Sequence, residues 1–459
     1  MNHKLRLSLI IVLCMAVTMA TFGSNGTQIG TIGARSSSMG ANFRGLADDW
    51  TAAFYNPAGL TQFDSKFTIG GMVSLIRPTG SYTALAYPEL VSPFTVLDDK
   101  EHDLKEKNFL VPSFGLYYRM SEKVVLGLGV FAPFGLGTEW DIYSLPAGYP
   151  DPTQSTLTEK YEHYSDHQVI NVQPTVAFQL SDKLSLGIGI SYIWGKMDLD
   201  IVNILFLPAA VLGGFPGIVE SSLSGSGSTF GATVGLLLKA TEKLSIGVSA
   251  RYAQDLAMTG DLTQKSLLYL QALNTNELEY DIEADLPLPM TAGIGFAYRA
   301  SDKLVITADA SYTKWDSWGD IDVKVKDGDD VALKQDWENT MEYGAGFEYK
   351  AMDKEDKALF IRGGFYTVDT PAPDETMSPT ILDPTRRLVI TGGLGLDMGK
   401  IALSIGGEYL IFKDNEIDEY NLGQQELQPG LTVNTPENYA GTYKFNAIVA
   451  YIEMVVKIN

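Results

Sequence analysis

The sequence predicts an all-β protein, namely a 14-stranded antiparallel transmembrane β-barrel with a short, partly helical plug at its N-terminus. Three observations lead to this prediction: a repeated turn-and-strand segment, alternating strands long enough to cross a membrane, and a regular exchange of short and long connections. The 459 residues include 45 Gly, and 11% are aromatic, a composition typical of strands with one apolar face.

A repeated segment marks the start of four strands. Its copies begin at Ser121, Ser181, Thr241 and Ser301, and each runs through an acidic residue and a Lys into an alternating strand. After the second copy, Leu and Ile share one face of LSLGIGIS, whereas Gly and Ser share the other. A soluble sandwich also alternates, but its polar face is usually charged. The repeat therefore indicates tight polar turns that feed membrane strands.

Strand length and loop asymmetry decide between barrel and sandwich. A transmembrane strand needs roughly 9 to 11 residues, and all the predicted strands reach that length. They are expected at 66–76, 109–119, 123–140, 166–180, 183–200, 228–240, 243–263, 278–300, 303–318, 335–350, 357–370, 383–398, 400–413 and 440–459. Short connections such as 180–183 alternate with long ones such as 201–227, which predicts periplasmic turns and outer loops.

The last predicted strand is less regular than the others. Tyr443 and Phe445 take the apolar face first, but Ile452 and Met454 take it further along. The change of phase near Val449 predicts a β-bulge, with Tyr443 and Phe445 facing outward.

The chain divides into three parts. Residues 1–23, with two basic residues ahead of an apolar run, are typical of a signal peptide. Residues 24–65 precede the first strand, and residues 66–459 form the barrel. Because an open 14-stranded lumen would leak, residues 24–65 are expected to lie inside as a plug. A stripe with spacings of three and four predicts a helix that Pro57 ends; its members are Met39, Phe43, Ala47, Trp50 and Phe54.

Three stretches of the sequence carry a resemblance to a known family. They are GANFRGLADDWTAAFYNPAGL, VPSFGLYYRMSEKVVLGLGVFAPFGLGTEW and RGGFYTVDTPAPDETMSPTILDPTRR, in this order. On these stretches the chain resembles the FadL family of outer-membrane transporters for long-chain fatty acids and aromatic hydrocarbons. The resemblance implies that the plug is a hatch with Asn56, Pro57 and Ala58 as its motif. One departure is the C-terminus, which ends in Asn459 instead of the aromatic residue that assembly factors often read.

The third predicted strand contains a break. Proline cannot donate to the strand ladder and glycine permits a bulge, so an interruption is expected at Pro133, Phe134 and Gly135. The resemblance implies that substrate leaves sideways into the bilayer through a gap there. Lateral exit suits apolar cargo, because its release into water would forgo about 0.8 kcal/mol per CH₂. A harmless bulge near the outer rim is the alternative.

Two outer loops are unusually apolar. One lies within 201–219 and the other within 264–276. The resemblance implies a groove that captures substrate first, whereas mutual packing as a lid is the alternative reading. The candidate residues are Leu205, Phe206, Leu207, Phe215, Leu267, Leu268 and Leu270.

Three arginines are expected to point into the lumen by strand phase: Arg251, Arg362 and Arg387. One of them could pair with the carboxylate of a fatty acid. Equally, they could form a charge network with partners such as Asp309. An aromatic hydrocarbon would need no cation.

Competing classes of site find little support. Glu162, His163, Asp166 and His167 have a spacing that could bind metal on a helix, but a solvated pair in a loop is expected instead. No catalytic motif, metal site or cofactor is predicted, so the chain is not expected to be an enzyme. The net charge of −22 argues against nucleic acid as a partner.

The sequence therefore predicts a multi-pass protein of the bacterial outer membrane. Its expected partners are hydrophobic small molecules, the lipid bilayer and the outer-membrane assembly machinery. The resemblance implies passive transport, with long-chain fatty acids as the leading cargo. An aromatic hydrocarbon, haem and the role of a non-specific porin are the alternatives.

Overall fold

The computed structural model describes residues 32–85, 99–143, 163–205, 217–266, 277–328, 330–354, 357–428 and 431–458. The predicted signal peptide, residues 1–23, lies outside the described residues, as does the start of the predicted plug. Among the described residues, no helix is both long and apolar enough to cross a membrane.

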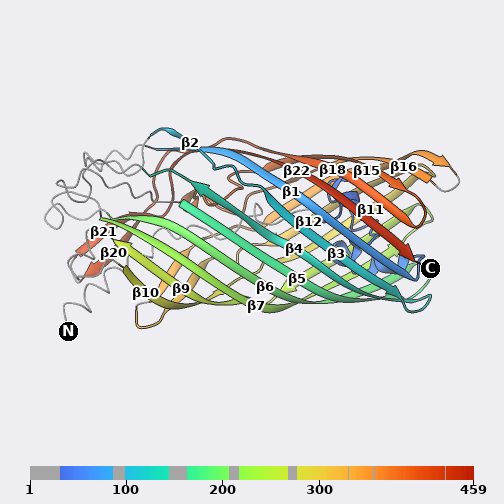
Figure 1. The fold of residues 1–459 in the computed structure, drawn as a ribbon, viewed down its shortest axis with the longest axis horizontal. Coiled ribbons are helices and arrows are strands. Elements are labelled where there is room, and N and C mark those ends of the chain that lie inside the picture. Colours follow the sequence, from blue (N-terminus) through green and yellow to red (C-terminus); the bar gives the residue numbers. More distant parts are fainter. Residues whose placement is uncertain are drawn as a thin grey trace.

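The strands form a closed antiparallel barrel, as predicted (Figure 1). We call each crossing of the barrel wall a stave. The wall has fourteen staves, because β8 and β9 together make one crossing, and β10 and β11 together make another. β1 pairs with β22 along its whole length and closes the ring. The staves are β1 (Phe67–Ala84), β3 (Phe109–Arg119), β4 (Val124–Trp140), β5 (His163–Gln179), β6 (Leu184–Leu205), β7 (Gly217–Lys239), β8 (Leu244–Ala253), β9 (Leu256–Ser266), β10 (Glu277–Leu286), β11 (Met290–Ser301), β12 (Leu304–Lys314), β15 (Thr340–Lys354), β16 (Lys357–Val368), β17 (Arg387–Asp397), β18 (Ile401–Phe412) and β22 (Gly441–Ile458).

Short elements decorate the outer end of the barrel, on the left in Figure 1. β13 adds to β10, and β20 with β21 forms a separate hairpin. These elements are β2 (Glu101–Asp103), β13 (Asp320–Val325), β14 (Val331–Lys334), η4 (Asp374–Thr376), β19 (Asn415–Ile417), β20 (Leu422–Gln428) and β21 (Leu431–Pro436). The short turns lie at the opposite, periplasmic end together with the described end of β22.

The wall reaches further outward than the sequence predicted. β6 continues to Leu205 and β7 begins at Gly217, so much of the predicted loop 201–227 is paired strand. The first half of β7, with alternating Ser and Gly, lacks the apolar outward face by which strands were predicted. Beyond the membrane both faces of a strand meet water, and pairing continues without that pattern.

The predicted bulge in the last strand is wrong. β22 pairs continuously with both β1 and β18, and the ladders contain no register shift. Tyr443 and Phe445 lie on the inward face and are 0% and 3% exposed. Ile448 and Ile452 face the lipid at 57% and 60% exposure. The apolar side chains near the outer end of β22 face inward because the lumen itself is apolar there.

The N-terminal residues 32–66, named the hatch segment below, lie inside the barrel near its periplasmic end (Figure 1). The single predicted helix is wrong. Instead there are three one- or two-turn helices: α2 (Ala34–Ser37), α3 (Ala52–Tyr55) and the 3-10 helix η2 (Pro57–Gln62). Positive φ angles at Gly40, Ala41 and Ala47 interrupt the helical path between α2 and α3. The predicted apolar stripe is nonetheless buried throughout.

Candidate functional site

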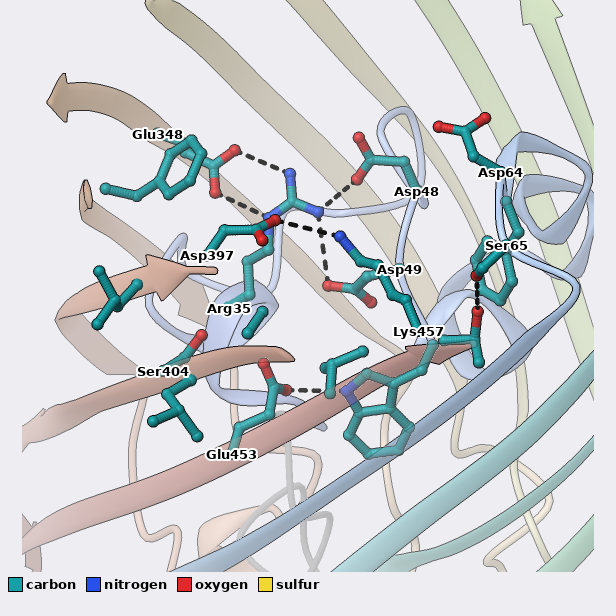
Figure 2. Close-up of a pocket in the computed structure, with 18 of the residues that line it drawn as sticks. Arg35, Asp48, Asp49, Asp64, Ser65, Glu348, Asp397, Ser404, Glu453 and Lys457 are labelled. Carbon is teal, nitrogen blue, oxygen red and sulfur yellow. Dashed lines mark hydrogen bonds and ion pairs between the residues drawn. The ribbon is translucent and has the colours of Figure 1, made fainter. Parts of the chain in front are cut away.

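Buried ion pairs fasten the hatch segment to the wall. Glu348 of β15 accepts hydrogen bonds from Arg35 of the hatch segment at 2.8 Å and from Arg362 of β16 at 2.7 Å. Arg35 also reaches Asp48 at 2.6 Å and Asp49 at 3.6 Å (Figure 2). One wall carboxylate thus neutralises two guanidinium groups, and one of these belongs to the hatch segment.

Two more carboxylates of the wall bind the main chain of the hatch segment. Oδ2 of Asp309, on β12, accepts from the backbone N–H groups of Phe43 at 3.1 Å and Arg44 at 3.0 Å. Oε2 of Glu453, on β22, accepts from Trp50 Nε1 at 3.0 Å and from a backbone N–H of α2 at 2.9 Å. Both acids face inward, and among the described residues the hydrogen-bond donors of both belong to the hatch segment.

The predicted hatch motif packs against glycine residues of the barrel wall. Asn56 donates from Nδ2 to the carbonyls of Arg44 at 3.0 Å and Leu236 at 2.9 Å, while its Oδ1 accepts from Ala58 N at 3.2 Å. A Cβ on Gly187 would lie 2.2 Å from the carbonyl carbon of Pro57, and one on Gly235 would lie 2.1 Å from Asn56 Oδ1. The Gly-rich strand face therefore makes room for this turn.

A polar cavity of about 260 Å³ lies beneath the hatch segment at the periplasmic end (Figure 2). Its charged lining comes from both partners, with Arg35 and Asp49 on the hatch segment and Asp397 and Lys457 on the wall. Burial opposes the charge of Arg35, but Asp48, Glu348 and Asp49 raise its pKa well above the usual value. Burial raises the pKa of the Asp49 carboxyl, against the influence of Arg35. The charged groups around this cavity therefore bind the hatch segment to the barrel wall.

The ladder between β3 and β4 is incomplete. Pairing runs from Arg119 and Val125 to Phe114 and Val130 and then ends. Further out, the backbone N–H of Lys105 donates to the carbonyl of Glu139 at 3.0 Å. Between these points, residues 109–113 of β3 pair with β1 and most of residues 131–138 of β4 pair with β5, but the two stretches do not pair with each other; we name them the unpaired stretch.

The predicted break residues lie in this unpaired stretch. The β4–β5 ladder shifts register between Phe131 and Phe134, so Pro133 sits in an irregularity of the strand. Gly135 has a φ of 151°, a backbone conformation that disfavours residues with a side chain. Of the Phe134 side chain nothing is described. The sequence thus located the interruption of β4 correctly, and its role in substrate exit stays a prediction.

Aromatic side chains of the hatch segment lie at the inner edge of the unpaired stretch. The ring of Phe131, 1% exposed, stacks at 6.4 Å on Trp50 and meets Phe54 edge-on at 5.6 Å. Trp50 rests on Gly70 of β1 and Gly115 of β3, whose added Cβ atoms would come within 2.2 Å and 2.9 Å of its ring. The hatch segment therefore covers the wall where β3 and β4 separate.

The three predicted lumen arginines have different surroundings. Arg362 is bound to Glu348, and Arg387 lies 3.3 Å from the buried Asp383, so both belong to charge networks. Arg251 donates to the Phe54 carbonyl at 2.7 Å and lies 4.2 Å over the Phe54 ring. It lines a cavity of about 40 Å³, and the described residues record no ion pair for it. Asp309 pairs with Arg44 of the hatch segment and with none of the three.

The predicted capture loops fall largely outside the described residues. Leu205 ends β6, but its side chain is not described. The remaining candidates lie beyond the described ranges: Phe206, Leu207, Phe215, Leu267, Leu268 and Leu270.

The connection between β16 and β17, residues 369–386, crosses the lumen and is named the crossing segment below. The carbonyl of Pro379 accepts from Trp140 Nε1 at 2.9 Å, and Ser378 Oγ lies 3.5 Å from His163 Nε2. Trp140 ends β4 and His163 begins β5, staves far around the ring from β16 and β17. The sequence offered no sign of this path beyond the third stretch of family resemblance.

The described residues contain no group of three or more metal-binding side chains that could hold an ion. His163 does not belong to a solvated loop, as was expected, because it is 0% exposed and starts β5. Its Nδ1 lies 2.9 Å from the Tyr143 hydroxyl, and its ring contacts Tyr439. His167 is half-buried, and Glu162 lies outside the described residues. His163 thus has a packing role at the outer end.

The acids that hold the hatch segment were missed from the sequence. Asp309, Glu348 and Glu453 lie on the inward faces of their strands and are at most 8% exposed. An acid at an inward position was a usable signal, since buried carboxylates require partners. Matching them with Arg35 and Arg44 in the leader would have predicted the fastening.

Comparison with known proteins agrees with this architecture. Residues 15–454 match the model of a family described as outer membrane protein transport protein (OMPP1/FadL/TodX). The chain belongs to this family. It is therefore a multi-pass protein of the bacterial outer membrane and a transporter for hydrophobic compounds.

Individual relatives are distant but match over nearly their whole length. The chain is 22% identical to outer membrane protein P1 of Haemophilus influenzae, covering 93% of this chain and 95% of the relative. Its fold is similar to that of a Pseudomonas aeruginosa FadL homologue, with a TM-score of 0.72, 17% identity, and coverage of 97% and 100%. The Ralstonia pickettii toluene transporter TbuX gives a TM-score of 0.65 at 17% identity, with coverage of 94% and 99%.

Proposed function

We propose that this protein carries long-chain fatty acids into the outer membrane and releases them sideways through the unpaired stretch between β3 and β4. Uptake proceeds by capture at the apolar outer loops, binding in the lumen, movement of the hatch segment and lateral exit. The observation that carries this proposal is the incomplete β3–β4 ladder, with Trp50 and Phe54 packed behind it. No step requires a cofactor or a catalytic group.

Lateral exit is supported by the chemistry of the cargo. An alkyl chain that passes from an apolar lumen into lipid never meets water, whereas release into the periplasm would forgo about 0.8 kcal/mol per CH₂. In the state described, Phe131 and Trp50 are both buried and seal the inner side of the unpaired stretch. Movement of the hatch segment would withdraw Trp50 and leave Phe131 free to turn.

Arg251 is the best candidate among the three arginines for binding a fatty-acid carboxylate. Arg362 and Arg387 already face carboxylates of the chain, whereas the recorded bonds of Arg251 go to a carbonyl and a ring. Its Nε has no hydrogen-bond partner and is buried. The cavity of about 40 Å³ beside it has room for a small polar head group and none for an alkyl chain. The chain would extend from there along the lumen.

The test is uptake of labelled oleate by cells that lack other fatty-acid transporters. Replacing Pro133→Val and Gly135→Val together fills the wall, and oleate uptake should fall by roughly tenfold or more, equivalent to about 1.4 kcal/mol or more in the barrier. A matched control is Gly392→Val, because a Cβ at Gly392 of the fully paired β17 meets only one atom, at 3.8 Å. Transport at the wild-type rate by the wall-filled but correctly assembled double variant would exclude lateral exit there.

Alternative cargoes are separated by the same assay. Toluene needs no cation, so Arg251→Gln should slow oleate uptake and leave toluene uptake unchanged. A haem transporter would take up neither. Small sugars report on a non-specific porin: if deletion of the gene lowers sugar uptake and leaves every apolar compound unaffected, the transporter proposal is wrong.

A further inference from the structure

The outer end of the lumen is an apolar site already filled by the protein's own chain. Trp140 of β4 and Phe445 of β22 meet edge-on at 5.8 Å, and Tyr82 of β1 lies 4.8 Å from Tyr443 of β22. These four aromatic side chains are at most 3% exposed. They come from β1, β4 and β22 and form the wall of the site.

Aliphatic side chains of the crossing segment are buried at this end of the lumen, next to Pro379, whose carbonyl accepts the hydrogen bond of Trp140. Met377 is 0% exposed, Ile381 is 1% exposed and Leu382 is 6% exposed, although they belong to an outer connection. All three join the same continuous cluster of buried apolar side chains as Trp140 and Phe445. Space lined by aromatic side chains and occupied by aliphatic ones is an environment that also suits the alkyl chain of a fatty acid.

The middle of the crossing segment, around Met377, is held by neutral hydrogen bonds, whereas the buried Asp383–Arg387 ion pair holds its end next to β17. Its main chain accepts from Trp140 Nε1 at 2.9 Å, from Tyr439 N at 2.8 Å and from Asn438 Nδ2 at 2.9 Å. The hatch segment, in contrast, is bound through guanidinium and carboxylate groups. Charge-assisted hydrogen bonds are roughly twice as strong as neutral ones. Of the two obstacles in the lumen, the middle of the crossing segment is therefore the easier one to displace.

We propose that the crossing segment is an outer gate that occupies the first lumen site for substrate, and that an alkyl chain enters by displacing Met377 and Ile381. This inference rests on the proposed function, because it places a binding step ahead of hatch movement. The aromatic wall stays in place, since it belongs to paired strands. The ligand class is a long aliphatic chain, matching the aliphatic side chains that it replaces.

A removable cross-link tests whether the gate must open. In a Cys14→Ser background, which removes the single cysteine of the chain, Met377→Cys and Tyr439→Cys are combined. The backbone hydrogen bond of 2.8 Å between these residues brings them within reach of a disulfide. Oxidation should lower oleate uptake by roughly tenfold or more, and a reductant should restore it. Each single variant controls for loss of the native side chain.

A second pair controls for stapling in general. Val389→Cys with Leu410→Cys joins two residues that already pair in the wall, in β17 and β18, and oxidation there should leave uptake unchanged. Wild-type uptake by the fully oxidised Met377–Tyr439 pair would overturn the gate.

A labelling experiment separates failure of the gate from failure of the proposed function. Met377→Cys alone is exposed to a membrane-impermeant maleimide with and without oleate. Because Met377 is 0% exposed, labelling should be slow and should accelerate roughly tenfold when oleate displaces the segment. Unchanged labelling in cells that take up oleate overturns the gate alone. Absence of oleate uptake by the wild type overturns the proposed function, whereas accelerated labelling would still support the gate.

Discussion

At the periplasmic end of the lumen the hatch segment is held by guanidinium–carboxylate pairs. At the outer end the middle of the crossing segment is held by apolar packing and neutral hydrogen bonds, and a single buried ion pair, Asp383–Arg387, lies at its end next to β17. Both obstacles are parts of the same chain, and both are buried. Ion pairs lose much of their stabilisation when one partner is removed, whereas an apolar contact can be replaced by another apolar molecule. The outer obstacle is thus suited to exchange with cargo, and the inner one to staying in place until it is actively disturbed.

The largest effect is expected from Glu348→Ala. It leaves Arg35 and Arg362 without their shared carboxylate, and breaking such a buried pair costs about 3–5 kcal/mol. The hatch segment should detach, which planar-bilayer recordings would detect as increased ion conductance. Asp353→Ala is the matched control, because its ion pair with Lys350 is largely exposed and is worth at most about 1 kcal/mol. If Glu348→Ala has the same conductance as the wild type, ion pairs do not hold the hatch segment in place.

A smaller effect is expected from pH at the outer end. Burial raises the pKa of Asp383 to about 6, despite the opposing influence of Arg387, whereas a released carboxyl titrates near 3.9. The closed crossing segment binds this proton more tightly than the released one. Its stability gain is therefore complete below about pH 4 and is lost as the pH rises through about 6, by up to roughly 3 kcal/mol.

Hydrogen exchange measures this dependence. The amides of residues 376–382 should be better protected at pH 4.5 than at pH 7.5, after correction for the intrinsic exchange rate. Asp383→Asn should abolish the difference, because it removes the titrating group. Protection that falls on acidification would show that the ion pair with Arg387 outweighs burial.

The smallest effect is expected from Trp140→Phe. The ring remains, but the hydrogen bond to the Pro379 carbonyl is lost, which costs about 1 kcal/mol. Exchange in residues 376–382 should accelerate about fivefold, with the hatch segment unaffected. The control is Trp194→Phe in β6. Trp194 lies between two inward-facing residues of the strand, so its own side chain faces outward, away from the crossing segment. An equal acceleration in both variants would mean that the hydrogen bond does not hold the segment.

The sequence predicted the membrane part of the fold because a single rule applies there. A stave that faces lipid must alternate, and the repeat at Ser181 and its relatives makes that alternation visible. The rule fails at Tyr443 and Phe445, where apolar side chains face inward, because the outer lumen is as apolar as the lipid. It also fails along 217–227, where the wall stands in water on both sides.

The candidate site was predictable only in part. Pro133 and Gly135 disturb a strand by their own backbone chemistry, so the break in β4 was visible locally. The path of the crossing segment depends on contacts with Trp140 and His163, which are more than 200 residues away in the chain. Strand phase placed Arg251, Arg362 and Arg387 but could not show which of them already face an acid.

The place of Glu453 bears on how the molecule is assembled. This carboxylate binds Trp50 and the start of α2, and it lies in β22, the strand that closes the ring by pairing with β1. The earliest described part of the chain therefore obtains this anchor only from the last strand. Docking of the hatch segment through this anchor therefore cannot be complete until β22 is in place, so the last strand of the barrel is needed to hold its first residues.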